Sequence, residues 1–116
     1  MSTRANIIIT DGDDKLYFYR HSDGYPEGTM PTLNQFLDKV KKGEIRDNVS
    51  QSAGWLIVIG HEEYAKNREE YEHTRWKVGA YEPTTCIHGD IEYLYVIDLE
   101  KKEIINVPYK EWDNWE

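Results

Sequence analysis

The first hydrophobic pattern along the chain is that of a β-hairpin. Residues 6–10 are rich in isoleucine, and residues 15–21 alternate with the period of two that is typical of a strand. The tetrapeptide between them, Asp11-Gly12-Asp13-Asp14, consists of residues that tight turns favour. We therefore predict two antiparallel strands within residues 6–21.

A helical pattern follows the hairpin. Its apolar positions are spaced at i, i+3, i+4 and i+7, and they are Leu33, Phe36, Leu37 and Val40. Thr32 and Gln35 have the spacing of a capping box, which starts the helix at Thr32, and Gly43 is a stop signal. We expect the apolar stripe to pack on the strand at residues 6–10 or on the apolar face of residues 91–97.

A second helix is predicted after another capping box at Asn48-Val49-Ser50-Gln51, with Gly60 as its stop signal. The expected apolar face of this helix consists of Ala53, Leu56 and Ile57. The alternative is a buried strand over residues 55–59, since this run holds three β-branched residues and periodicity alone does not separate the two structures.

The last third of the chain alternates again. Residues 74–81 are predicted to form a single strand. Residues 91–99 form a longer strand, which Glu100-Lys101-Lys102-Glu103 turns into another at residues 104–107. One face of the longer strand consists of Ile91, Tyr93, Tyr95, Ile97 and Leu99.

These elements predict an α+β fold in the order ββααβββ. About five strands form a largely antiparallel sheet, and two amphipathic helices cover it in a two-layer sandwich. A length of 116 residues suits one hydrophobic core, and no repeat or linker interrupts it. Residues 1–116 are therefore predicted to be a single domain that folds alone or as a homodimer.

Charge and cysteine content exclude several classes of protein. The formal charge of −8 argues against direct nucleic-acid binding, which needs clustered Lys and Arg. The longest apolar run is too short for a membrane span, and the first residues lack the apolar stretch of a secretory leader. The single cysteine, Cys86, has no partner for an internal disulfide. We expect a cytoplasmic protein whose acidic surface keeps it in solution or docks on a basic partner.

Residues 19–28 form the densest polar and aromatic cluster. In the functional interpretation Arg20 binds an anion, Tyr25 forms a wall of the pocket, and His21 or Asp23 moves a proton or orients the ligand. In the structural interpretation the Gly and Pro residues of this segment only form turns at the end of a strand.

Residues 81–90 form a second polar cluster between two predicted strands. Thr84, His88 and Asp90 are its candidate ligand-binding residues, and the alternative is again a sharp strand connection. Both clusters contain His-x-Asp, yet none of the known zinc spacings is present, so we predict no metal and no cofactor. Cys86 lacks a catalytic signature and is expected to be a small buried residue.

The C-terminal tail carries two indoles. Trp112 and Trp115 would share one face of a helix, flanked by acids, and could anchor a partner protein. Alternatively, both fold back on the sheet and complete the core.

Two segments resemble a group of small uncharacterised proteins from bacteria and their phages. These are residues 2–9 (STRANIII) and residues 19–28 (YRHSDGYPEG), and residues 54–56 and 87–93 are similar too. The resemblance covers most of the chain and implies a phage or prophage origin without an activity. Small acidic phage proteins often inhibit host defence systems.

The leading hypothesis is a non-enzymatic binding protein that occupies a host protein or sequesters a small anionic ligand. It follows from the size, the acidity and the lack of known catalytic motifs. One alternative is a small hydrolase or transferase with a catalytic set drawn from both clusters, namely Arg20, His21, Asp23, His88 and Asp90. The other is a structural or assembly protein that docks through its tail. The enzyme hypothesis requires the two clusters to share one cleft.

Overall fold

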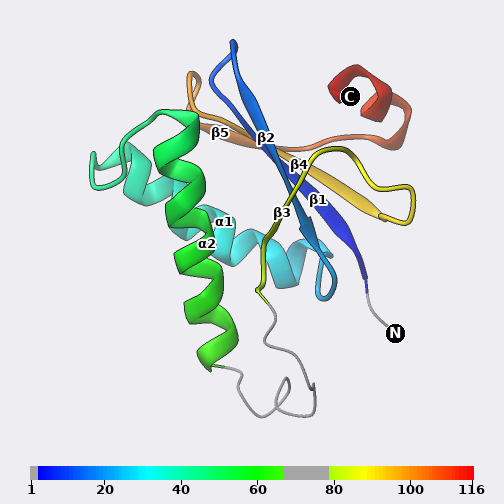
Figure 1. Cartoon of the computed structure of the whole chain (residues 1–116), viewed down its shortest axis with the longest axis horizontal. Helices are drawn as coiled ribbons and strands as arrows, with labels where there is room; N and C mark the ends of the chain where they lie inside the picture. Colours follow the sequence, from blue (N-terminus) through cyan, green and yellow to red (C-terminus); the bar gives the residue numbers. More distant parts are fainter. Residues whose placement is uncertain (1–2, 67–78) are drawn as a thin grey trace.

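A computed structural model describes residues 3–66 and 79–116 (Figure 1). In chain order its elements are β1 (Ala5–Thr10), β2 (Lys15–Arg20), α1 (Pro26–Lys41), α2 (Val49–Lys66), β3 (Glu82–Thr84), β4 (Tyr93–Asp98), β5 (Glu103–Asn106) and the 3-10 helix η1 (Tyr109–Trp115). The predicted α+β class and the order ββααβββ are confirmed.

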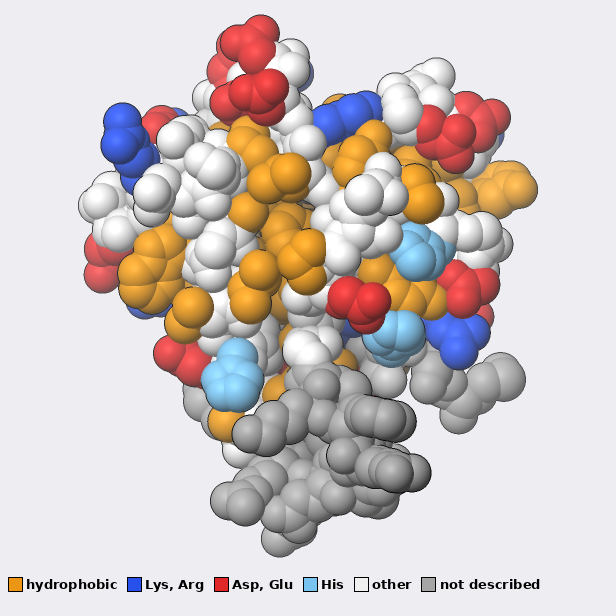
Figure 2. All heavy atoms as spheres, in the orientation of Figure 1, with side chains coloured by type: hydrophobic (Ala, Val, Ile, Leu, Met, Phe, Trp, Pro, Cys, Tyr) orange, Lys and Arg blue, Asp and Glu red, His pale blue; other side chains and the backbone are white. Residues whose placement is uncertain are grey.

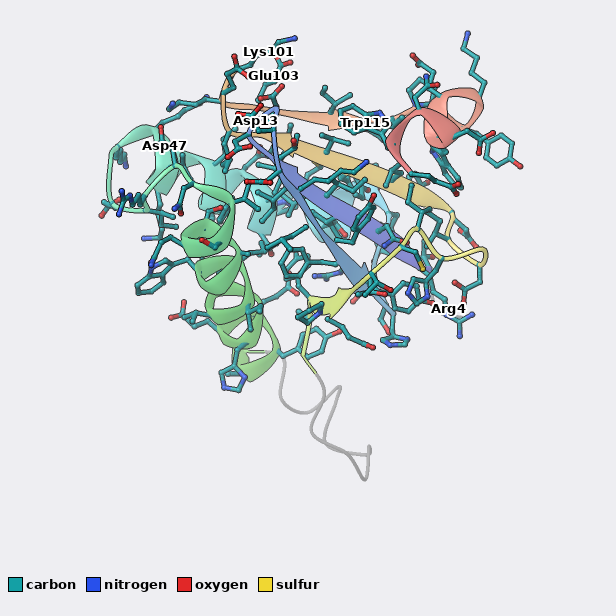
Figure 3. The ribbon with its side chains drawn as sticks, turned by 45° about the horizontal axis from the view of Figure 1, so that its top comes forward. Arg4, Asp13, Asp47, Lys101, Glu103 and Trp115 are labelled. Atoms are coloured by element: carbon teal, nitrogen blue, oxygen red, sulfur yellow. The ribbon has the colours of Figure 1, made fainter. Side chains whose placement is uncertain are left out.

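The five strands form one mixed sheet in the order β3-β2-β1-β4-β5. β1 lies in the middle, antiparallel to β2 and parallel to β4, so that Ile8 stands opposite both Tyr17 and Val96. The pairs β2–β3 and β4–β5 are antiparallel, in agreement with a largely antiparallel sheet. Because β1 and β4 run the same way, the turns that follow them meet at one end of the sheet, where Figure 3 shows Asp13 and Lys101.

β1 explains the isoleucine run at the start of the chain. All six of its residues are buried, because both faces of this central strand are covered. Ile7 and Ile9 face the helices, whereas Ile8 faces the opposite side of the sheet. A strand that is buried on both faces favours apolar residues on both, and four of the six residues of β1 are apolar.

The core between the sheet and the helices contains the predicted stripe of α1. Its four buried side chains are Leu33, Phe36, Leu37 and Val40. They belong to one cluster with Ile7 and Ile9 of β1 and with Tyr95 and Ile97 of β4. The expectation that this stripe packs on the first strand or on the 91–97 face is therefore confirmed.

The start of α1 differs from the prediction. The helix begins at Pro26, with Tyr25 as an extended N-cap, and not at a capping box on Thr32. Proline is favoured in the first turn because its fixed φ suits the helix and the N–H it lacks would be unpaired there. Thr32 lies inside the helix, and its hydroxyl donates to Glu63 instead of capping. The predicted stop is correct, since Gly43 has a φ of +78° after the last turn.

Residues 55–59 are helical, which settles the choice between helix and strand. The side-chain Oδ1 of Asn48 accepts a hydrogen bond from the N–H of Gln51 at 2.9 Å, as the predicted cap requires. In the described parts of the chain, neither α2 nor any other helix has the length and apolar content that a membrane span needs.

Gly60 does not end α2, which continues to Lys66. A Cβ at Gly60 would lie 2.5 Å from Cδ2 of Tyr81 and 3.0 Å from Cβ of Ala80, so this glycine permits close approach of the segment before β3. The predicted apolar face also needs correction, because Ile57 is exposed while Ala53 and Leu56 are buried.

The third strand lies later in the chain than predicted. Residues 74–78 of the expected strand are outside the described residues, and residues 79–81 are not in a strand. Instead, β3 occupies part of the predicted 81–90 loop and pairs with β2, with Thr84 opposite Tyr17. Pro83 is tolerated there because β3 is an edge strand.

The face of the sheet opposite the helices is also covered. The residues buried there are Ile8, Tyr19, Ile91, Leu94, Val96 and Val107. Trp112 and Trp115 of η1 pack against them, and Nε1 of Trp112 donates to the carbonyl of Val107 at 3.0 Å. Figure 1 shows η1 on the side of the sheet away from α1 and α2. The helices therefore cover one face of the sheet, and η1 forms a smaller cover on the other face.

Removal of the Leu37 side chain tests the helix-side core. We expect Leu37→Ala to lower the free energy of unfolding by about 2–5 kcal/mol, because it leaves a cavity in a closed cluster. Leu16→Ala is the matched control, since Leu16 is 41% exposed and its loss should stay within about 0.5 kcal/mol. Denaturant unfolding measures both, and equal losses would contradict this core.

Candidate functional site

The predicted site residues divide between the two faces of the sheet. Successive side chains of a strand point to opposite faces. Arg20, at the end of β2, points into the helix side, whereas Tyr19 belongs to the opposite face, where it contacts His21 and His88. The two polar clusters of the sequence therefore meet around Tyr19, but without Arg20.

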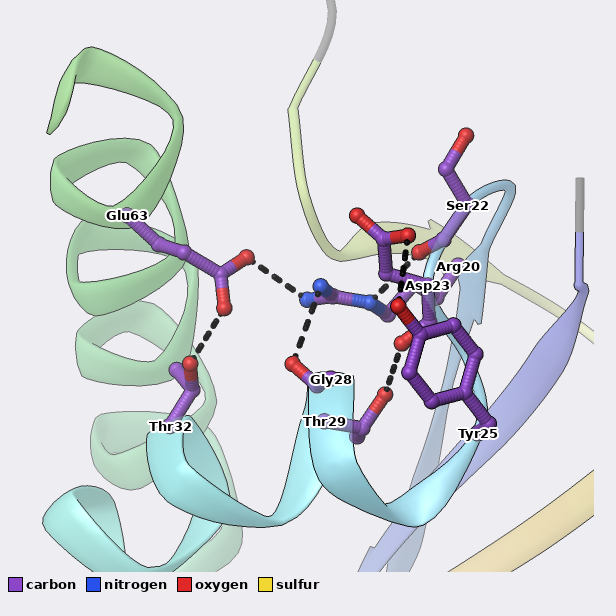
Figure 4. A network of polar contacts seen from close by, with 8 residues as sticks. All are labelled: Arg20, Ser22, Asp23, Tyr25, Gly28, Thr29, Thr32 and Glu63. Atoms are coloured by element: carbon purple, nitrogen blue, oxygen red, sulfur yellow. Dashed lines mark hydrogen bonds and ion pairs between the residues drawn. The ribbon is translucent and has the colours of Figure 1, made fainter. Parts of the chain in front are cut away.

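Arg20 lies in a buried network of polar contacts (Figure 4). Its side chain is 1% exposed, and each guanidinium nitrogen donates to an acceptor of the protein. Nε donates to the carbonyl of Ser22 at 2.8 Å, and Nη2 to that of Gly28 at 3.4 Å. Nη1 forms an ion pair of 2.8 Å with Glu63, whose other oxygen accepts from the Thr32 hydroxyl.

The surroundings hold the guanidinium in its charged form. Burial alone would lower the pKa of Arg20, but its interactions with Tyr81 and Glu63 outweigh burial and raise the pKa. The guanidinium also lies over the ring of Tyr81, 5.1 Å from its centroid. The carboxylate that pairs with Arg20 is therefore Glu63 of α2, which is 43 residues further along the chain. Each guanidinium nitrogen therefore already has an acceptor within the protein, and binding of a ligand anion by Arg20 stays a prediction.

Asp23 and Tyr25 shape the turn that leads into α1. Asp23 has a φ of +58°, and its carbonyl accepts a hydrogen bond of 2.7 Å from the Thr29 hydroxyl. The Tyr25 hydroxyl donates to Oδ1 of Asp23 at 3.3 Å. A Cβ at Gly28 would lie 2.5 Å from the Asp23 carbonyl oxygen, so only glycine fits. Asp23 and Tyr25 thus contact each other within this turn, and ligand binding by them stays a prediction.

The remaining candidates form a group around Tyr19 on the opposite face, which we call the Tyr19 cluster. Its members are Tyr19, His21, Glu82, Thr84, His88 and Asp90. The ring of His88 stacks on Tyr19 with centroids 4.0 Å apart, and that of His21 meets its edge at 4.5 Å. Figure 2 shows two imidazoles close together beside acidic side chains on this part of the surface.

Polar atoms of the Tyr19 cluster pair with one another. Nε2 of His21 lies 2.8 Å from Glu82, and Nε2 of His88 lies 2.8 Å from the Thr84 hydroxyl. The Tyr19 hydroxyl donates to both oxygens of Asp90, at 3.0 and 2.8 Å. Arg4 adds an exposed ion pair with Asp90 at 3.4 Å. Burial, together with the hydrogen bond to Asp90, raises the pKa of Tyr19 to about 12.

Asn6 forms hydrogen bonds with the backbone beneath the Tyr19 cluster, and it was not identified from the sequence. It is fully buried in the isoleucine-rich β1, and its Oδ1 accepts from the N–H of His88 at 2.8 Å. Its Nδ2 donates to the carbonyls of Phe18 and Cys86 at 3.0 and 3.3 Å. A polar side chain within a buried apolar strand was the available signal, since such groups need hydrogen-bond partners. Cys86 itself is exposed, contrary to the prediction.

The arrangement does not assemble the proposed catalytic set. His21, His88 and Asp90 lie together, but Arg20 and Asp23 are held on the helix side and in the turn before α1. Among residues 3–66 and 79–116, no three His, Cys, Asp or Glu side chains converge as they would for a metal ion. The polar groups of the Tyr19 cluster therefore bond mainly to one another on the protein surface and do not line an open cleft.

A groove between α1 and α2 was not identified from the sequence. Its volume is about 280 Å³, and its walls include Trp55, Val58 and Ile59 with Lys39 and Glu62. Trp55 and Val58 are 48% and 42% exposed. The sequence of α2 has apolar residues on several faces of the helix, which is typical of a helix buried in a hydrophobic core. The sequence therefore did not indicate that one apolar face is exposed. Figure 2 shows hydrophobic side chains on the surface along α2.

The tail indoles lie on the sheet, as in the second of the two predicted arrangements. Trp112 and Trp115 are half-buried. The carbonyl of Trp115 accepts from Lys15 Nζ at 2.8 Å and from the Tyr17 hydroxyl at 3.1 Å, which ties η1 to β2. Partner binding by these two residues stays a prediction.

In comparisons with known proteins, no family model, no curated protein and no solved structure matches the chain. The candidate sites are therefore assigned from geometry, within a mixed α+β fold.

Loss of Arg20 should be far more damaging than loss of an exposed arginine. Arg20→Ala removes the buried ion pair with Glu63 and the hydrogen bonds to Ser22 and Gly28, and we expect the free energy of unfolding to fall by about 3–5 kcal/mol. Arg4→Ala removes the exposed ion pair with Asp90 and should change stability by less than about 1 kcal/mol. Urea unfolding measures both variants. Similar small losses would mean that the Arg20 network is not buried in solution.

The raised pKa of Tyr19 depends partly on Asp90. In Asp90→Asn the negative acceptor is lost, so the pKa of Tyr19 should fall below the value of about 12 while burial keeps it above the usual 10. Tyrosine ring carbons followed by NMR against pH report this, and Tyr19→Phe assigns the signal. Asp113→Asn, an exposed acid on η1, should leave the titration unchanged. An unshifted Tyr19 in Asp90→Asn would rule out the coupling.

Proposed function

We propose that this chain is a non-enzymatic binding protein that acts by occupying the surface of another protein. The observation that carries the proposal is the exposed face of α2. From residue 49 to residue 60 the helix has no charged side chain, although Trp55, Ile57 and Val58 are all more than a third exposed. Contiguous apolar surface of this kind marks protein interaction sites.

The groove beside this face favours a protein partner over a small ion. Trp55 and Val58 border a hollow of about 280 Å³, into which a partner side chain could fit as an anchor. Large aromatic residues contribute strongly to binding when they become buried at an interface. The alternative, sequestration of a small anion by Arg20, has less support because that guanidinium already pairs with Glu63.

The class of partner that we propose is a protein of a bacterial host, including components of defence systems. This part of the proposal rests on the resemblance of residues 2–9 and 19–28 to small phage proteins. The formal charge of −8 suits a partner with a basic surface around an apolar centre. An inhibitor of this type needs no catalytic group, only an interface that blocks the partner.

Crosslinking from α2 tests the proposal. A photoreactive amino acid at position 58 should capture a host protein from a bacterial lysate, and mass spectrometry identifies it. The captured protein is then purified and its binding measured against wild type and Val58→Asp. A buried carboxylate opposes the contact, so we expect at least a tenfold loss of affinity.

Tyr109→Asp is the matched control, because Tyr109 is a 79% exposed aromatic residue on η1, away from α2. It should bind as wild type does, and circular dichroism should show both variants folded. Equal affinity of Val58→Asp and wild type would place the interface elsewhere. Crosslinks that form from position 109 and not from position 58 would place it on η1.

A further inference from the structure

A glycine on the outer face of α2 has no explanation within the chain. Gly54 is exposed, and a Cβ built on it would meet nothing within 4 Å. Its φ is ordinary for a helix, and glycine in a helix interior is less stable than alanine there by about 0.8–1 kcal/mol. Gly60, six residues later, differs because the ring of Tyr81 fills the space beside it. The fold therefore requires Gly60 but not Gly54.

Gly54 lies in the middle of the apolar face that the proposed function uses. Ile57 and Val58 lie one helical turn further along, at i+3 and i+4, and Trp55 is the next residue in the chain; all three are exposed. A missing side chain in such a face lets another backbone approach closely, since the distance between packed helices depends on the side chains at the contact. Glu62, one helical turn after Val58, lines the groove, as do Glu44 and Lys39.

We infer that the occupant of this face is an α-helix of the partner protein, packed closely on α2 over Gly54, with a basic residue directed at Glu62. The inference rests on the proposed function and specifies its partner. Charge complementarity supports the basic residue, because two acids and one lysine line the groove and residues 49–60 of α2 carry no charge. An amphipathic helix in an apolar groove is a common mode of recognition.

Gly54→Ala gives opposite expectations for stability and for binding. The methyl group enters open space in the free protein and favours the helix, so the melting temperature should rise by about 4 °C. The same methyl group obstructs a closely packed helix, so affinity for the purified protein captured at position 58 should fall at least tenfold. Gly89→Ala is the control, since its added methyl group also meets nothing within 4 Å but lies in the loop after β3. It should leave affinity unchanged.

The outcomes separate this inference from the proposed function. Loss of affinity in both Val58→Asp and Gly54→Ala supports both. Loss in Val58→Asp with full affinity in Gly54→Ala keeps the surface but overturns the closely packed helix. Full affinity in both variants overturns the surface itself. A captured protein that is a second copy of this chain would also overturn the inference.

The basic residue has its own test. Glu62→Lys should weaken binding at least tenfold by repelling that residue, whereas Glu92→Lys, outside α2, should not. Unchanged affinity of Glu62→Lys would overturn the basic contact.

Discussion

The buried ion pair between Arg20 and Glu63 is the constraint on which the arrangement of the helices depends. The hydrophobic effect is not directional, so burial of apolar surface alone specifies the position of α2 less strictly than hydrogen bonds do. A guanidinium that is 1% exposed has no such freedom, because it must meet acceptors from α2, from α1 and from the turn at Ser22 at the same time. This requirement fixes the end of β2 relative to both helices. It also explains the composition of the YRHSDGYPEG segment, in which Asp23 takes a left-handed conformation and Gly28 packs on its carbonyl.

Much of the fold could be predicted because its signals are local. Alternation and helical spacing identified both hairpins and the buried stripe of α1, and the cap at Asn48 was read from side-chain chemistry alone. The errors came from features that depend on distant parts of the chain. Gly60 has the appearance of a helix stop, yet its role is set by Tyr81, 21 residues later, and Glu63 has no local feature that marks it as the partner of Arg20.

The same alternation that allowed the strands to be predicted also divided the candidate site. Neighbours in a strand point to opposite faces, so Arg20 and His21 could not share one pocket while β2 remained regular. The two histidines do meet around Tyr19, although they come from different polar clusters of the sequence. The exposed face of α2 was missed for a different reason. Periodicity shows which positions of the helix are apolar, but it does not show which of these side chains are exposed to solvent.

The short third strand limits how this sheet can associate with other chains. β3 has three residues, and its middle residue is Pro83, which has no N–H to offer. A neighbouring strand would find few donors along that edge, so sheet extension between molecules, the usual route to fibrillar aggregates, is disfavoured there. Contacts with another molecule at this edge would therefore be made by side chains and not by backbone hydrogen bonds. Within the part of the chain that the structure describes, the exposed apolar helix is thus combined with a sheet edge that offers a neighbouring strand few hydrogen-bond donors.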